Sequence, residues 1–136
     1  MLMPKKVKYR KTHKGRRRYD GEASRGTYLS FGEYGLKALE THWITANQIE
    51  SVRRLVARIL KKRGKFWIRI FPAKSVTMKG AEIPMGQGKG AVDHYVAPIK
   101  AGTILFEVTG IPEELAREVF LGVAYKLPIK TRFITR

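Results

Sequence analysis

The sequence contains no cysteine, only eleven acidic residues and no long hydrophobic run. Without cysteine, the chain can form no disulfide, no thiolate metal site and no thiol nucleophile. No apolar stretch approaches the roughly 18 residues that a membrane-spanning helix needs, and no apolar segment follows the basic N-terminus as in a secretory signal. We therefore expect a soluble intracellular protein with no membrane partner. A transit peptide, which is also basic and poor in acids, stays open as an alternative.

Positive charge dominates the sequence. The 28 lysines and arginines give the 136-residue chain a formal net charge of +17. Such a charge predicts an acidic partner and binding that weakens steeply with salt. The hydrophobic share of 43% and the length predict one domain with its own core.

The charge is densest in residues 1–26, which we interpret as a basic arm with little structure of its own. Its first 25 residues hold ten lysines and arginines against Asp20 and Glu22, and contribute +8. The interleaved rings of Tyr9, His13 and Tyr19 could stack on bases, which favours RNA over duplex DNA. A solvated charge run or a localisation signal is the alternative. The candidate RNA-binding residues are Lys5, Lys6, Lys8, Tyr9, Arg10, Lys11, His13, Lys14, Arg16, Arg17 and Arg18.

The pattern of residues 27–136 predicts a single α+β domain, with two helices packed on a mostly antiparallel sheet. Strands are expected at 27–31, 66–71, 94–99, 103–108 and 129–134, and residues 34–39 as a further extended piece. Residues 73–93 lack periodicity and are expected to form a long loop. The strands at 94–99 and 103–108 are expected to pair as a hairpin, with Gly102 in the left-handed position of its three-residue turn.

The first helix has the clearest signals in the sequence. Thr45 and Gln48 have the spacing of a capping box, and Ile44 and Ile49 that of a hydrophobic staple. The helix is predicted to run to Arg63 and to end at Gly64. Its apolar face comprises Ile49, Val52, Val56, Ile59 and Leu60.

A second helix is predicted to begin with Pro112 at its first position and to continue to Lys126. Its core face comprises Leu115, Ala116, Val119, Phe120 and Val123. Pro128 is expected to stop it.

The polar face of the first helix is a second candidate binding surface. It carries Arg53, Arg54, Arg58, Lys61 and Lys62, with Glu50 as the only acid nearby. Arginines without acidic neighbours fit phosphate oxygens bidentately. The alternative is a face that serves only solubility.

The glycine-rich segment Met85, Gly86, Gln87, Gly88, Lys89 and Gly90 is a third candidate. Alternating glycines let a ligand approach the backbone closely. A Walker phosphate-binding loop does not fit, because Lys89 is followed by Gly90 rather than by Ser or Thr. A dinucleotide-binding fingerprint does not fit either, because a strand rather than a helix follows the segment. We interpret the segment as a loop inserted into folded RNA, with Lys79 and Lys89 neutralising phosphates. An inert turn is the alternative.

Catalysis and metal binding have little support. His13, His42 and His94 lie in separate segments without metal-ligand spacing. Asp93 and His94 could form a base and its orienting acid, but no placed nucleophile accompanies them. We expect no enzyme activity, no metal and no cofactor.

Eight sequence blocks, in order along the whole chain, resemble the family of bacterial-type large-subunit ribosomal protein sixteen. They begin at Met1, Tyr9, Phe31, Ile44, Lys65, Met85, Ile111 and Lys126, and include Phe31-Gly-Glu-Tyr-Gly-Leu-Lys-Ala-Leu39 and Lys126-Leu-Pro-Ile-Lys-Thr-Arg-Phe133. Two departures stand out. Pro84 replaces a loop arginine that many bacterial members carry and some hydroxylate, and the arm has about three extra residues near 19–24.

The resemblance implies a protein of the large ribosomal subunit, in the cytoplasm or in an organelle, beside neighbouring ribosomal proteins and without self-association. It implies that the arm and first helix bind large-subunit rRNA. It also implies that the loop from Lys79 to Gly90 reaches toward A-site tRNA near the peptidyl-transferase centre, and that the protein aids late subunit assembly. A free RNA chaperone or general nucleic-acid-binding protein is the alternative.

Overall fold

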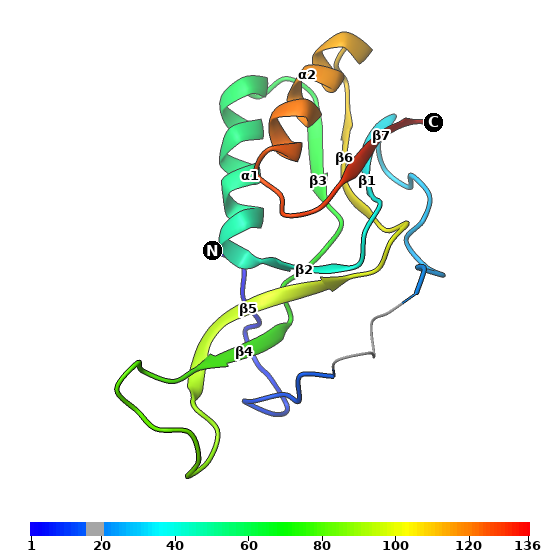
Figure 1. Cartoon of the computed structure of the whole chain (residues 1–136). Helices are drawn as coiled ribbons and strands as arrows, with labels where there is room; N and C mark the ends of the chain where they lie inside the picture. Colours follow the sequence, from blue (N-terminus) through cyan, green and yellow to red (C-terminus); the bar gives the residue numbers. More distant parts are fainter. Residues whose placement is uncertain (16–20) are drawn as a thin grey trace.

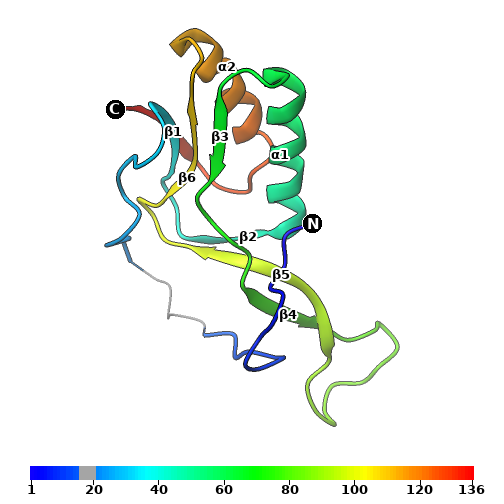
Figure 2. The same ribbon diagram turned by 180° about the vertical axis from the view of Figure 1, so that it is seen from behind.

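The protein's structure, a computed structural model, describes residues 1–15 and 21–136. Two helices cover one face of a four-stranded sheet, and a three-stranded sheet extends from the end of this body (Figures 1 and 2). All pairings between the named strands are antiparallel. The expected α+β class is confirmed, although the strands form two sheets rather than one. Neither helix in the described part of the chain is long and apolar enough to cross a membrane.

The four-stranded sheet has the spatial order β3-β6-β1-β7. Its strands are β3 (Lys65–Ile68), β6 (Ile104–Thr109), β1 (Tyr34–Ala38) and β7 (Thr131–Thr135). The three-stranded sheet has the order β2-β5-β4, with β2 (His42–Thr45), β5 (Ala91–Ile99) and β4 (Lys74–Met78). The helices are α1 (Ala46–Leu60) and α2 (Glu113–Ala124).

The apolar faces predicted for the helices form the core. Ile49, Val52, Val56 and Leu60 of α1 and Ala116, Val119, Phe120 and Val123 of α2 are buried, whereas Ile59 and Leu115 are partly exposed. The capping box is present, since the Gln48 amide donates to Thr45 Oγ1 (3.2 Å) and the Thr45 amide to Gln48 Oε1 (2.9 Å). Pro112 occupies the N-cap of α2 rather than its first helical position.

The helix α1 ends at Leu60, earlier than predicted. Lys61 and Lys62 already have left-handed backbone angles, and Lys61 is the C-cap. Gly64 is not the C-cap; instead, it allows the backbone to pass close to β6, because a Cβ there would lie 2.2 Å from the carbonyl oxygen of Thr109. The chain must therefore leave the helix early enough to cross the end of β6.

Residues 27–31 are not a strand. The backbone amides of Ser30, Phe31 and Gly32 donate to the side chain of Glu107 rather than to a neighbouring strand. The segment therefore crosses the face of the sheet opposite the helices.

The hairpin prediction for 94–99 and 103–108 was also wrong. The first of these strands belongs to β5, whose two edges pair with β2 and β4, whereas β6 pairs with β1 and β3. Gly102 does have a positive φ, 96°. The strands β2 and β4 were not predicted, because their sequence patterns are weak. Since β4 and the start of β5 occupy part of the expected loop 73–93, the loop in the structure comprises only residues 79–90.

Candidate nucleic-acid interface

The described part of the arm lies across the three-stranded sheet. Leu2 packs against the core, and the chain then runs from beside the first turn of α1 over β4 and β5 (Figures 1 and 2). Thr12 Oγ1 donates to the carbonyl of Ser75 (3.2 Å), and Lys74 Nζ donates to that of His13 (2.8 Å). The sheet therefore holds the arm in part through the arm's backbone.

The charged side chains in the described part of the arm are exposed. Lys5, Lys6, Lys8, Arg10, Lys11 and Lys14 are exposed and form no ion pair within the described residues. Tyr9 is 70% exposed, and the Lys8 ammonium lies 5.6 Å from its ring centre. A ring beside unpaired cations suits RNA, which offers both bases and phosphates. Arg16, Arg17 and Arg18 lie outside the described residues.

Lys74 is a cation of this region that sequence reasoning missed. It is only 8% exposed, and its ammonium lies 5.3 Å from the centre of the Trp43 ring. It anchors the arm on β4, within a segment predicted to be loop. The weak alternation of Val76 and Met78 with polar residues was the signal for this strand.

The cations of α1 fall into two groups. Glu50 forms ion pairs with Arg53 (2.5 Å) and Arg54 (3.3 Å), as its position in the sequence suggested. The Arg53 hydrogen bond is the main reason why the pKa of Glu50 is lowered to about 2. Arg58, Lys61 and Lys62 are exposed and have no ion pair in the part of the chain that the structure describes.

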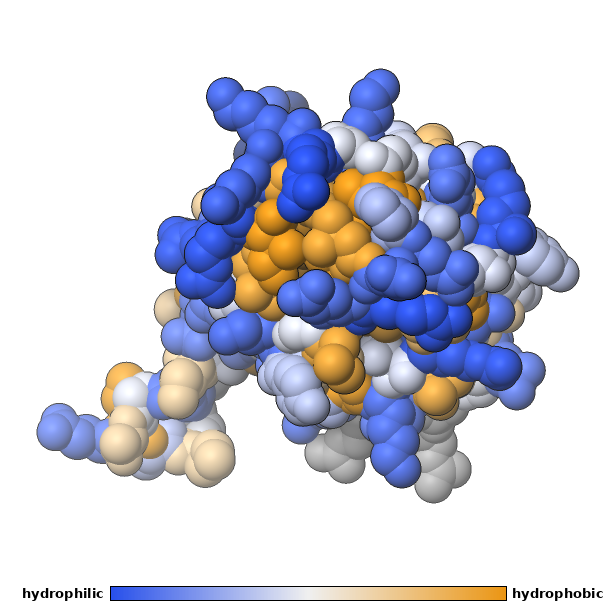
Figure 3. Space-filling view, turned by 90° about the horizontal axis from the view of Figure 1, so that it is seen from above, coloured by the Kyte–Doolittle hydropathy of each residue, from blue (hydrophilic) through white to orange (hydrophobic). Residues whose placement is uncertain are grey.

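The glycine-rich loop extends from the body as a separate lobe (Figure 3). Residues 80–89 are all exposed. Gly86, Gln87 and Gly88 have consecutive positive φ angles, and a Cβ on either glycine would meet nothing within 4 Å. Its tip is therefore backbone that a large ligand can approach closely.

Two lysines join the loop to the arm. Lys11 Nζ donates to the carbonyl of Lys89 (3.0 Å), and Lys89 Nζ donates to the carbonyl of Thr12. Lys79 Nζ meanwhile bonds within the loop, to the carbonyl of Gly86 (2.5 Å). The structure thus brings together two of the three predicted surfaces. It leaves the cations at the end of α1 on the opposite side of the body from the loop (Figure 1).

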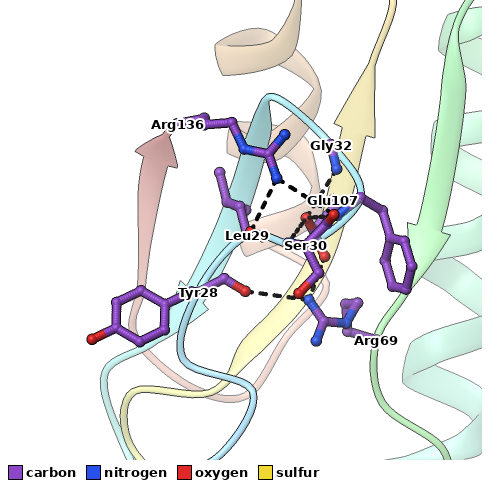
Figure 4. Close-up of polar contacts among 8 residues, drawn as sticks. Tyr28, Leu29, Ser30, Gly32, Arg69, Glu107 and Arg136 are labelled. Carbon is purple, nitrogen blue, oxygen red and sulfur yellow. Dashed lines mark hydrogen bonds and ion pairs between the residues drawn. The ribbon is translucent and has the colours of Figure 1, made fainter.

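Glu107 was not singled out by the sequence, although it is the only acid in the apolar strand β6. Its side chain is fully buried; Oε1 accepts the amides of Ser30, Phe31 and Gly32 at 2.9 to 3.0 Å, and Oε2 accepts from Arg69 (Figure 4). Burial alone would raise the pKa of Glu107, but these four donors lower it. The carboxylate therefore fixes the segment that crosses the sheet.

Asp93 and His94 are the two residues for which the sequence suggested a base and its orienting acid. His94 Nδ1 lies 2.6 Å from Asp93 Oδ2, on a solvent-exposed strand end. Within residues 1–15 and 21–136, no group of three His, Asp or Glu side chains is placed to hold a metal ion. The two side chains form an exposed hydrogen-bonded pair at the start of β5.

Comparison with known proteins decides the family. The sequence model of the ribosomal protein L16p/L10e family matches residues 4–134. The chain belongs to this family. It is 59% identical over its whole length to "Large ribosomal subunit protein uL16c" of Thalassiosira pseudonana, and 56% identical to "Large ribosomal subunit protein uL16" of Thermosipho melanesiensis. The alignments cover 98% and 94% of those two proteins.

The resemblance stated from the eight sequence blocks is thereby confirmed. As an L16p/L10e family member, the chain is a ribosomal protein rather than an enzyme.

Proposed function

We propose that this L16p/L10e protein is a structural component of the large ribosomal subunit that binds large-subunit rRNA through its arm and the exposed cations of α1. The loop from Lys79 to Gly90 approaches A-site tRNA, and the protein aids late assembly of the subunit. The names of its relatives support a place in the large ribosomal subunit, and the net charge of +17 supports RNA as the main partner.

The link between arm and loop, in which Lys11 Nζ donates to the carbonyl of Lys89 and Lys89 Nζ to that of Thr12, carries the proposal. It ties the arm to the base of a loop 78 residues later, and both lie outside the helical body. An arm bound to rRNA would therefore also fix the direction in which the loop projects. A loop that must meet a second RNA needs such an anchor, because its exposed tip has no packing of its own.

The α1 surface is tested by removing three unpaired charges in the variant R58Q/K61Q/K62Q. Each lost phosphate contact should reduce the slope of log affinity against log salt by about one unit, so the variant should lose about three. The matched control K126Q/K130Q/R132Q also removes three positive charges, but outside α1. Its slope of log affinity against log salt should stay steeper than that of R58Q/K61Q/K62Q. Equal slopes for the two variants would refute a specific α1 surface.

The loop is tested by replacing residues 80–89 with Asn-Gly, a two-residue turn that suits the β4–β5 pairing. The variant should enter large subunits in stoichiometric amounts, as judged on high-salt sucrose gradients. A-site tRNA binding by these subunits should be impaired. The control K89M keeps the loop and the hydrogen bond from Lys11 to the backbone carbonyl of residue 89, and removes one loop cation together with its hydrogen bond to Thr12. Unchanged tRNA binding by the shortened variant would refute the role of the loop.

The same gradient tests the alternative of a free RNA chaperone. A ribosomal component remains with the large subunit after a high-salt wash. A free chaperone would be substoichiometric, salt-labile or at the top of the gradient.

A further inference from the structure

The outward face of β3 combines cationic and aromatic side chains at an edge of the four-stranded sheet. Because successive strand residues point to opposite faces, Lys65, Trp67 and Arg69 share the face away from the helices. Phe66 points inward and stacks on Phe106, with ring centres 5.7 Å apart. The face therefore presents a ring between two cations, outside the core and outside the three surfaces described above.

Phe31 extends this arrangement from the segment that crosses the sheet. Its ring stacks on that of Trp67, with centres 5.8 Å apart and planes inclined by 24°. The Arg69 guanidinium lies 5.2 Å from the centre of the Phe31 ring. Phe31 nevertheless remains 56% exposed. The stack therefore ends in aromatic surface that is open to solvent.

The buried carboxylate of Glu107 holds this stack in place. It accepts the amide of Phe31 and those of both neighbours, and it pairs with Arg69 (Figure 4). Gly32 allows the segment to lie this close, since a Cβ there would be 2.6 Å from the carbonyl oxygen of Val108. Binding to such a fixed platform loses little conformational entropy.

We propose that the Phe31–Trp67 pair is a stacking platform for an unpaired RNA nucleobase, with Lys65 placed to neutralise a flanking phosphate. The inference rests on the proposed RNA-binding function. An RNA base is favoured because every base offers a flat face and Arg69 adds a cation to the stack. The negative charge of Glu107 is already compensated by Arg69. Glu33 is the nearby exposed acid, and it accepts from Thr109 Oγ1 (3.0 Å).

The experiment compares two variants of Phe31. F31Y keeps an aromatic ring, whereas F31L keeps an apolar side chain but has no ring. Both variants, checked for folding by circular dichroism, are titrated with protein-free large-subunit rRNA and with tRNA at fixed salt. F31Y should bind like the parent protein and F31L about tenfold more weakly. The control Y125L removes a ring that is 81% exposed at the end of α2 and should change nothing. Ultraviolet cross-linking should attach a nucleotide to the peptide of Phe31 or of Trp67.

The two RNAs show whether the base comes from rRNA or from tRNA. Equal affinities of F31L and F31Y for both RNAs, with no cross-link at either ring, would overturn the platform while leaving RNA binding intact. An equal loss for F31L and Y125L would also overturn it. If the parent protein failed to bind either RNA, the proposed function would fall together with the platform.

Discussion

Replacing Glu107 with glutamine should strongly destabilise the fold at neutral pH. The amide keeps the shape of the side chain and one acceptor oxygen, but it loses the charge that pairs with Arg69 and turns an N–H group toward one of its donors. Removing one partner of a buried ion pair costs about 3 to 5 kcal/mol. Because the Arg69 side chain is still 18% exposed and can rehydrate, we expect about 3 kcal/mol.

That loss is large against the roughly 5 to 15 kcal/mol that stabilises a typical domain. Urea unfolding followed by tryptophan fluorescence measures it directly, with Trp67 near the altered site. The control E33Q removes an acid of the same segment that is exposed and accepts one hydroxyl hydrogen bond. It should cost under about 0.5 kcal/mol. A difference of less than 1 kcal/mol between the two variants would contradict the role assigned to Glu107.

The pH dependence gives a second test of the same reasoning. The pKa of Glu107 is lower in the folded protein than its usual value of about 4.3 in an unfolded chain. Its ionised form therefore stabilises the fold fully above that unfolded value, and this contribution declines as the pH falls through the lower folded value. The gap in free energy of unfolding between the parent protein and E107Q should shrink in this acidic range. A gap independent of pH would show that the charge of Glu107 is not what stabilises the segment.

The remaining predictions concern local backbone features. G64A should destabilise the protein by more than about 2 kcal/mol, because its Cβ would collide with the carbonyl of Thr109 in addition to the left-handed strain. G26A, at a glycine with the same φ of 66° but nothing within 4 Å, should cost only about 1 kcal/mol, and equal losses in thermal unfolding would refute the distinction. T45A should lose about 1 kcal/mol through the capping box that Thr45 forms with Gln48, measured by urea unfolding. An unchanged midpoint would contradict that role.

Local signals predicted the helices well. The capping box at Thr45 and the apolar periodicity of both helices depend on residues only a few positions apart, and both features are present. The end of α1 could not be predicted in this way. It depends on the contact between Gly64 and Thr109, which lie 45 positions apart and meet only when β3 pairs with β6.

The strands show the same limit more strongly. The apolar pattern of residues 94–99 indicates a strand, but it does not say that β2 and β4 will occupy both of its edges. A short turn through Gly102 therefore suggested a hairpin where the chain passes between two sheets. For residues 27–31, a buried carboxylate replaced the neighbouring strand as the acceptor of the backbone amides.

By itself, the sequence determined the α+β class and the family, and it predicted the surfaces that we propose to meet RNA, because composition, periodicity and motif order are local or cumulative properties. Only the tertiary structure decided which of these residues act together. It joined Lys11 to Lys89 and buried Glu107 beneath the segment that carries Phe31. The long-range contacts arise from the pairing of strands and the close approach of chain segments, which sequence spacing does not encode.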